Sequence, residues 1–155
     1  MRFDPEGLYR FDIIYFSPCS LFRFICDKQK LTQRGWVTEL VQIYELLHPR
    51  GFEILAFPCN QFGAQEKGTE AEIEEFVKQY NVKFPMFEKV EVNGPDAHPV
   101  WRFLKAQLGG VLGSSIKWNF TKFLCDKNGI PRHRYGPPTA PTSIVGDIEK
   151  LLAEA

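Results

Sequence analysis

The clearest periodicity in the chain is helical. From Trp36 to Leu47 the large apolar residues recur every three or four positions, which places them on one face of a helix. The sequence His48-Pro49-Arg50-Gly51 then supplies the proline and glycine typical of a helix end. The next run, Phe52 to Phe57, is short, apolar and bounded by glycine and proline, so it predicts a buried parallel strand. A helix followed by such a strand is half of a βαβ unit.

Helical and extended patterns continue through the middle of the chain. Thr69 and Glu72 have the spacing of a capping box, and the apolar positions after them predict a helix from about Glu70 to Tyr80. The residues from Phe84 to Val92 alternate well enough to predict an extended segment. An Asn-Gly turn then leads to a helical stretch at about Val100 to Leu108.

The C-terminal third predicts a hairpin and a closing helix. Residues Trp118 to Cys125 and Ile130 to Tyr135 are strand-like and are separated by the turn sequence Asp126-Lys127-Asn128-Gly129. The tail from Thr142 to Leu152 presents one apolar face. Early alternation of helix and strand with a late antiparallel hairpin predicts an α/β protein: a thioredoxin-like fold with a central mixed sheet and helices on both faces.

Composition narrows the class of protein. A chain of 155 residues is the size of one domain, and 44% hydrophobic with 25% charged residues is typical of a folded globular protein. Equal numbers of basic and acidic side chains exclude a general attraction to nucleic acid or anionic lipid. The apolar stretch from Phe11 to Ile25 is interrupted by polar residues and predicts neither a bilayer span nor a signal peptide. We therefore expect a cytoplasmic protein whose mature chain starts at or near Met1.

The cysteines and histidines predict neither a disulfide framework nor a metal site. They are scattered, contain no Cys-x-x-Cys pair and form no mixed cluster. Reduced thiols are the expectation, with no metal and no cofactor. The residues are Cys19, Cys26, Cys59, Cys125, His48, His98 and His133.

Two short runs carry candidate chemistry: Phe57-Pro58-Cys59-Asn60-Gln61-Phe62-Gly63 and Lys117-Trp118-Asn119-Phe120-Thr121. Gln61 and Asn119 offer amide donors, and Trp118 offers an indole N–H that can only donate. Such donors suit peroxide reduction, in which a thiolate or selenolate attacks one oxygen and the departing alkoxide needs stabilisation and a proton. Each residue alone is also compatible with an ordinary loop or core role.

Together the two runs resemble the glutathione peroxidase family, with a Tyr80-Asn81-Val82-Lys83-Phe84 run similar to its phospholipid-hydroperoxide branch. The resemblance extends from about Leu40 to the C-terminus. It implies the thioredoxin-like fold, reduction of hydrogen peroxide and organic or lipid hydroperoxides in response to oxidative stress, and re-reduction by glutathione or a thioredoxin-like protein. It also implies that Gln61, Trp118 and Asn119 surround a cysteine or selenocysteine, and it makes a monomer plausible.

The nucleophile that the resemblance implies is missing from its expected place. Counting back from the helix at Trp36 puts it at Gln29 or Lys30, and neither side chain attacks a peroxide at neutral pH. Cys26 is the nearest thiol upstream and serves if the loop shifts register. Cys59 and Cys125 are better explained as buried packing residues.

Two explanations of this departure stay open. The chain could be a non-catalytic fold relative that keeps the donor pocket. Alternatively, its first thirty residues could differ from those of a working enzyme whose selenocysteine codon was read as a stop; residues 1–28 show no strand of the kind that opens the family's fold. The second explanation agrees with Val77 and Lys78 standing where cysteine-dependent members carry a resolving cysteine.

Basic residues near Trp118 offer a weak indication of substrate. They could attract glutathione carboxylates or lipid phosphates, or simply form a solvated face. His98, before Pro99, is expected to cap or pack at a helix start rather than act as a base. The basic residues are Lys117, Lys122, Lys127, Arg132 and Arg134.

Overall fold

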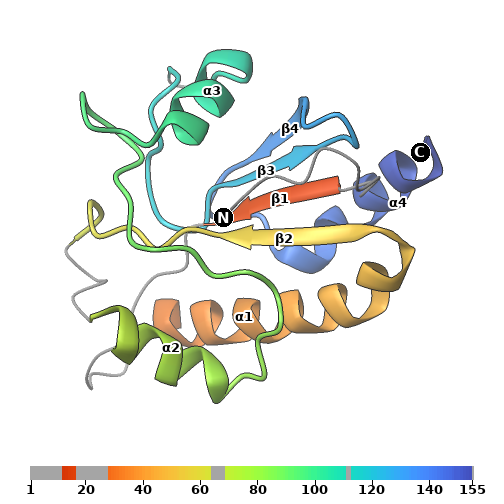
Figure 1. Cartoon of the computed structure of the whole chain (residues 1–155), viewed down its shortest axis with the longest axis horizontal. Coiled ribbons are helices and arrows are strands. Elements are labelled where there is room, and N and C mark those ends of the chain that lie inside the picture. Colours follow the sequence, from red (N-terminus) through yellow and green to blue (C-terminus); the bar gives the residue numbers. More distant parts are fainter. Residues whose placement is uncertain (1–11, 17–27, 64–68, 111–112, 155) are drawn as a thin grey trace, which may run out of the picture.

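The protein is described by a computed structural model over residues 12–16, 28–63, 69–110 and 113–154. Its centre is a four-stranded sheet in the order β2-β1-β3-β4 (Figure 1). The strands are β1 (Asp12–Phe16), β2 (Phe52–Ala56), β3 (Lys122–Cys125) and β4 (Pro131–Tyr135). β1 is parallel to β2 and antiparallel to β3, and β3 and β4 form the antiparallel hairpin. The mixed sheet predicted from the sequence is confirmed.

Strand β1 was not expected. It occupies an inner position, with Ile14 opposite Ile54 on one side and Leu124 on the other. The run Asp12-Ile13-Ile14-Tyr15-Phe16 consists largely of β-branched and aromatic residues, which is the ordinary strand signal. The expectation that residues 1–28 lack an opening strand is therefore wrong, because a short run paired with a strand on each side needs no polar alternation.

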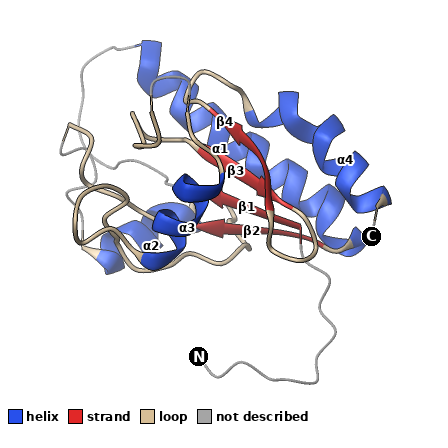
Figure 2. Cartoon of the chain, turned by 90° about the horizontal axis from the view of Figure 1, so that it is seen from above, coloured by secondary structure: helices blue, strands red, loops and turns tan. Residues whose placement is uncertain are grey.

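Helices cover both faces of the sheet, as Figures 1 and 2 show. Helices α1 (Lys28–Leu47) and α4 (Val145–Ala153) pack with β2 and β3 in one apolar cluster, and α3 (Pro99–Gln107) packs on the other face. β3 divides its side chains between the two clusters: Leu124 joins the first, while Phe123 and Cys125 join the second. This alternation follows from the two-residue period of a strand.

The remaining boundaries mostly follow the sequence pattern. α1 begins at Lys28, well before the predicted start at Trp36, and is followed by the short helix η1 (His48–Arg50). The capping box is confirmed: Thr69 N donates to Glu72 Oε2 (2.6 Å) and Glu72 N to Thr69 Oγ1 (3.3 Å), at the start of α2 (Glu70–Lys78). The short helix η2 (Pro141–Ile144) leads into α4.

Two predicted extended segments are shorter than expected. Between Phe84 and Val92 the structure has one isolated bridge, Met86 to Ala56, instead of a strand. The hairpin begins at Lys122 rather than Trp118, because Phe120 adopts a left-handed backbone (φ 58°) that cannot continue a strand. Both departures lie beside the candidate site.

Candidate active site

The loop 57–63 leaves the carboxyl end of β2 and is held by the side chain of Gln61. Gln61 Oε1 accepts hydrogen bonds from the backbone N–H groups of Val92 and Asn93, both at 2.9 Å, and Nε2 donates to Asn93 O at 3.0 Å. The amide is thus committed to the backbone of residues 92–93. A glutamine bonded in this way holds two loops together, and we call this contact the Gln61 bracket.

Asn93 extends this bracket to the second motif. Its Nδ2 donates to Ile116 O (2.8 Å), and its Oδ1 accepts from Ile116 N (2.9 Å). Lys105 from α3 donates to Val92 O and to Asn93 Oδ1. The chain of contacts therefore runs from Gln61 through Asn93 to the residue before the Lys117–Thr121 run, so the two motifs share one rigid frame.

In the loop 117–121 the side chains change abruptly from exposed to buried after Trp118. Asn119 and Phe120 are each 1% exposed, whereas Trp118 is 38% exposed. The positive φ of Phe120 makes the reversal possible, and such strain in a bulky residue is a feature of functional sites. The Trp118 ring lies 6.0 Å from that of Phe62, and its indole N–H has no partner within the part of the chain that the structure describes.

The end of β1 lies between these two loops. Phe16 is opposite Ala56, immediately before the loop 57–63, and Tyr15 is opposite Phe123, near the start of β3. Since β1 and β2 are parallel and β3 is antiparallel to β1, the loops 57–63 and 117–121 flank the point where the chain leaves β1. The connection from β1 to α1, residues 17–27, starts there.

Two of the cysteines are buried, and the other two lie outside the described residues. Cys59 and Cys125 are buried, and neither forms a disulfide within the described residues. Burial raises the pKa of the Cys59 thiol, although backbone N–H groups of Gln61 and Val92 oppose that effect. A buried thiol with a raised pKa is a poor nucleophile, in agreement with a packing role. Cys26, and likewise Cys19, lie outside the described residues.

Of the five basic residues expected around Trp118, Lys122 and Arg134 make internal contacts, while the other three are exposed. Lys122 is fully buried, with Nζ donating to Thr139 O (2.6 Å) and lying 4.4 Å from the Trp36 ring centroid. Arg134 donates to the carbonyls of Leu108, Ser114 and Ser115. A guanidinium has enough N–H donors to bind several carbonyl groups of one loop. A count of basic residues in the sequence therefore overestimates the charge displayed at the surface.

The other expectations on single residues have simpler outcomes. His98 caps α3, accepting from Val100 N through Nδ1 (3.4 Å), as predicted. Within the described residues, no group of three or more His, Cys, Asp or Glu side chains could hold a metal ion. No described helix is long and apolar enough to cross a bilayer.

Comparison with known proteins gives the family. A sequence model described as glutathione peroxidase matches residues 13–105. The chain belongs to the glutathione peroxidase family. A probable phospholipid hydroperoxide glutathione peroxidase of Citrus sinensis is 54% identical, over 92% of this chain and 85% of the relative. The crystal structure of T. cruzi GPX1 has a TM-score of 0.71 and 30% identity, over 97% of this chain and 88% of that one.

These findings confirm the phospholipid-hydroperoxide-like branch of the glutathione peroxidase family and its thioredoxin-like fold. Glutathione peroxidases are thiol-dependent, so the chain is an oxidoreductase of peroxidase type. A solved thioredoxin-like protein, 11% identical with a TM-score of 0.64, agrees on the fold.

The length covered differs among the glutathione peroxidase relatives. The chain spans 69% of a mitochondrial relative from Arabidopsis thaliana, which is 45% identical over 96% of this chain. It spans half of a putative chloroplastic one, 55% identical over 75% of this chain. The prediction of a cytoplasmic location is wrong, because it rested on missing sequence signals while these relatives are named for organelles.

Proposed function

We propose that this chain reduces organic and lipid hydroperoxides, as part of the response to oxidative stress, with a sulfur supplied by the connection between β1 and α1. The observation that carries the proposal is the position of the β1 end: Phe16 pairs with Ala56, between the loops that carry Gln61 and Trp118. Cys19 and Cys26 are the thiols of residues 17–27. Cys19 follows Phe16 by about 10 Å of extended chain at most.

The reaction needs two stages. The thiolate attacks the terminal oxygen of ROOH, the O–O bond breaks, and the cysteine becomes a sulfenic acid while the alkoxide takes up a proton to leave as ROH. A first reductant thiol then displaces water from the sulfenic acid to form a mixed disulfide, and a second thiol releases the enzyme thiol. In this scheme the Trp118 indole donates to the developing alkoxide, while Gln61 and Asn119 hold the loops that present it.

The reductant is proposed to be glutathione or a thioredoxin-like protein. A pocket of about 230 Å³ lies beside the Trp118 loop, with Lys117, Thr121 and Arg134 among its lining residues. The exposed Lys117 ammonium suits a carboxylate of glutathione, while Arg134 holds the loop that forms the pocket wall. We further propose that the chain acts as a monomer and a single domain.

Two variants test the source of the sulfur. Purified wild-type chain is mixed with tert-butyl hydroperoxide and glutathione, alongside Cys19→Ser and Cys26→Ser. We expect one of the two variants to lose turnover entirely and to lose the sulfenic acid that dimedone traps, with Cys125→Ser as the matched buried control. If the wild type neither consumes peroxide nor forms a sulfenic acid, the alternative of a non-catalytic fold relative stands instead.

A further inference from the structure

A second surface lies along the outer edge of β2, where residues 85–88 run beside Ala56. Ala56 on β2 donates its N–H to Pro85 O (3.0 Å) and accepts from Phe87 N (2.9 Å). Successive residues of an extended backbone direct their polar groups to opposite sides, so those of Met86 and Glu88 face away from β2. Within the described residues neither Met86 nor Glu88 makes a hydrogen bond. Among the described residues, the outward backbone groups of this extended segment are therefore available for pairing with another strand.

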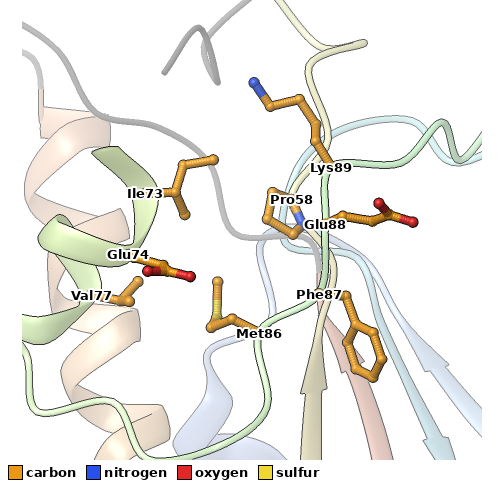
Figure 3. Close-up of a pocket in the computed structure, with 8 residues that line it drawn as sticks. All are labelled: Pro58, Ile73, Glu74, Val77, Met86, Phe87, Glu88 and Lys89. Carbon is orange, nitrogen blue, oxygen red and sulfur yellow. The ribbon is translucent and has the colours of Figure 1, made fainter. Parts of the chain in front are cut away.

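A pocket of about 110 Å³ lies between this edge and α2 (Figure 3). Its apolar wall includes Ile73 and Val77 from α2 and Met86 from the edge. The Glu74 side chain extends from α2 toward Met86. A cavity of this size takes the stem of one long side chain.

The charges around the pocket favour a cationic occupant. Glu74, Glu88 and Lys89 line it, and neither glutamate forms an ion pair within the part of the chain described by the structure. The Lys89 amine points away from Met86, whereas the Glu74 carboxylate points toward it (Figure 3). By contrast, the next acidic residue on α2, Glu75, pairs with Lys78 at 3.7 Å. Lysine and arginine have apolar stems and charged heads, so they match an apolar wall below an acidic group.

We propose that this edge binds an extended, basic segment of a partner protein as an added strand. The backbone of that segment pairs with Met86 and Glu88, and one of its lysine or arginine side chains lies in the pocket with its charge on Glu74. Main-chain pairing with alternate side chains in pockets is an established mode of peptide recognition. The proposal concerns binding alone and does not depend on peroxide turnover.

The test is a nuclear magnetic resonance titration of the full-length ¹⁵N-labelled chain with the peptide acetyl-Thr-Val-Lys-Val-Thr-amide. At saturation we expect amide hydrogen exchange at Met86 and Glu88 to slow at least about tenfold. The Phe87 amide, already bonded to Ala56, should change little. Glu74→Gln should weaken binding about threefold, the size expected of an exposed charge pair, whereas Glu75→Gln should not.

Two further peptides make the result decisive. A peptide with glutamate in place of lysine tests the charge, and one with N-methylated backbone amides tests the strand pairing without altering the protein. Both should bind far more weakly. Equal binding of either peptide, or unchanged exchange at Met86 and Glu88, overturns the proposal. Concentration-dependent shifts at these residues without peptide would assign the edge to a second copy of the chain and overturn it as well.

Discussion

The two motif loops flank the same end of β1 but are held there in different ways. The loop 57–63 combines burial with polar contacts: Phe57, Cys59 and Phe62 are buried, and the Gln61 amide adds three hydrogen bonds with residues 92–93. The loop 117–121 is held by burial, with Phe120 packed edge-on against Trp36 at 5.2 Å and Asn119 enclosed. Two side chains that the sequence offers as donors therefore have different roles. The Gln61 amide is hydrogen-bonded to the backbone, whereas the Trp118 indole is exposed.

The difference assigns separate roles to the residues that the sequence grouped together. A committed amide should matter mainly to stability. An exposed indole whose N–H has no partner among the described residues should matter mainly to chemistry. Four substitutions test this contrast.

Phe120→Ala should have the largest effect, because it empties a fully enclosed site between α1 and β3. We expect the free energy of unfolding to fall by about 3–5 kcal/mol. Urea denaturation followed by circular dichroism measures it. Phe120→Leu is the matched control and should lose less. A loss below about 1 kcal/mol for the alanine variant would mean that burial does not hold this loop.

Trp118→Phe should separate chemistry from stability. Phenylalanine keeps an aromatic ring against Phe62 and removes only the N–H. We expect kcat/KM for tert-butyl hydroperoxide to fall about 100-fold, as for loss of one oxyanion donor, with stability unchanged to about 0.5 kcal/mol. Phe62→Leu keeps the indole and should keep most of the rate. Full activity in Trp118→Phe would remove the indole from the mechanism.

Lys122 follows the loop 117–121 and is buried in the core. Its titration should make the free energy of unfolding depend on pH. Desolvation lowers its pKa to about 8, while Glu39 opposes the shift. An unfolded lysine titrates near about 10.4, so the unfolded chain binds this proton more tightly. The free energy of unfolding should therefore rise by about 2 kcal/mol between about pH 8 and 10.5. In Lys122→Met this rise should be absent, and parallel stability curves for the two proteins would refute the assignment.

Gln61→Ala should be mainly a stability variant. It removes the shared acceptor of Val92 N and Asn93 N, and we expect a loss of about 1.5 kcal/mol. Gln61→Glu retains a side-chain oxygen for both N–H groups and should lose less. If the alanine variant kept its stability and lost its peroxidase rate, the glutamine would be a catalytic donor and the contrast between the loops would collapse.

Much of the fold could be predicted from local patterns. Thr69 and Glu72 marked the start of α2, and the turn after Cys125 marked the hairpin, because capping and turn chemistry act between near neighbours. β1 was missed because its short apolar run carries no alternation, and its identity as a strand depends on pairing with residues 52–56 and 123–125. The β-branched and aromatic residues of this run favour a strand locally, but the partners that make it a central strand are far away in the chain.

The class of this protein follows from its amino-acid sequence: the order of its elements, its apolar faces and the residues of a peroxidase motif. How those residues are used follows from the packing of the folded chain. Whether Gln61 is a bracket, Trp118 an open donor or Lys122 a buried cation depends on which backbone groups and rings lie within a few ångströms. Hydrogen bonding and desolvation are short-range effects, and the neighbours that exert them are far apart in the chain.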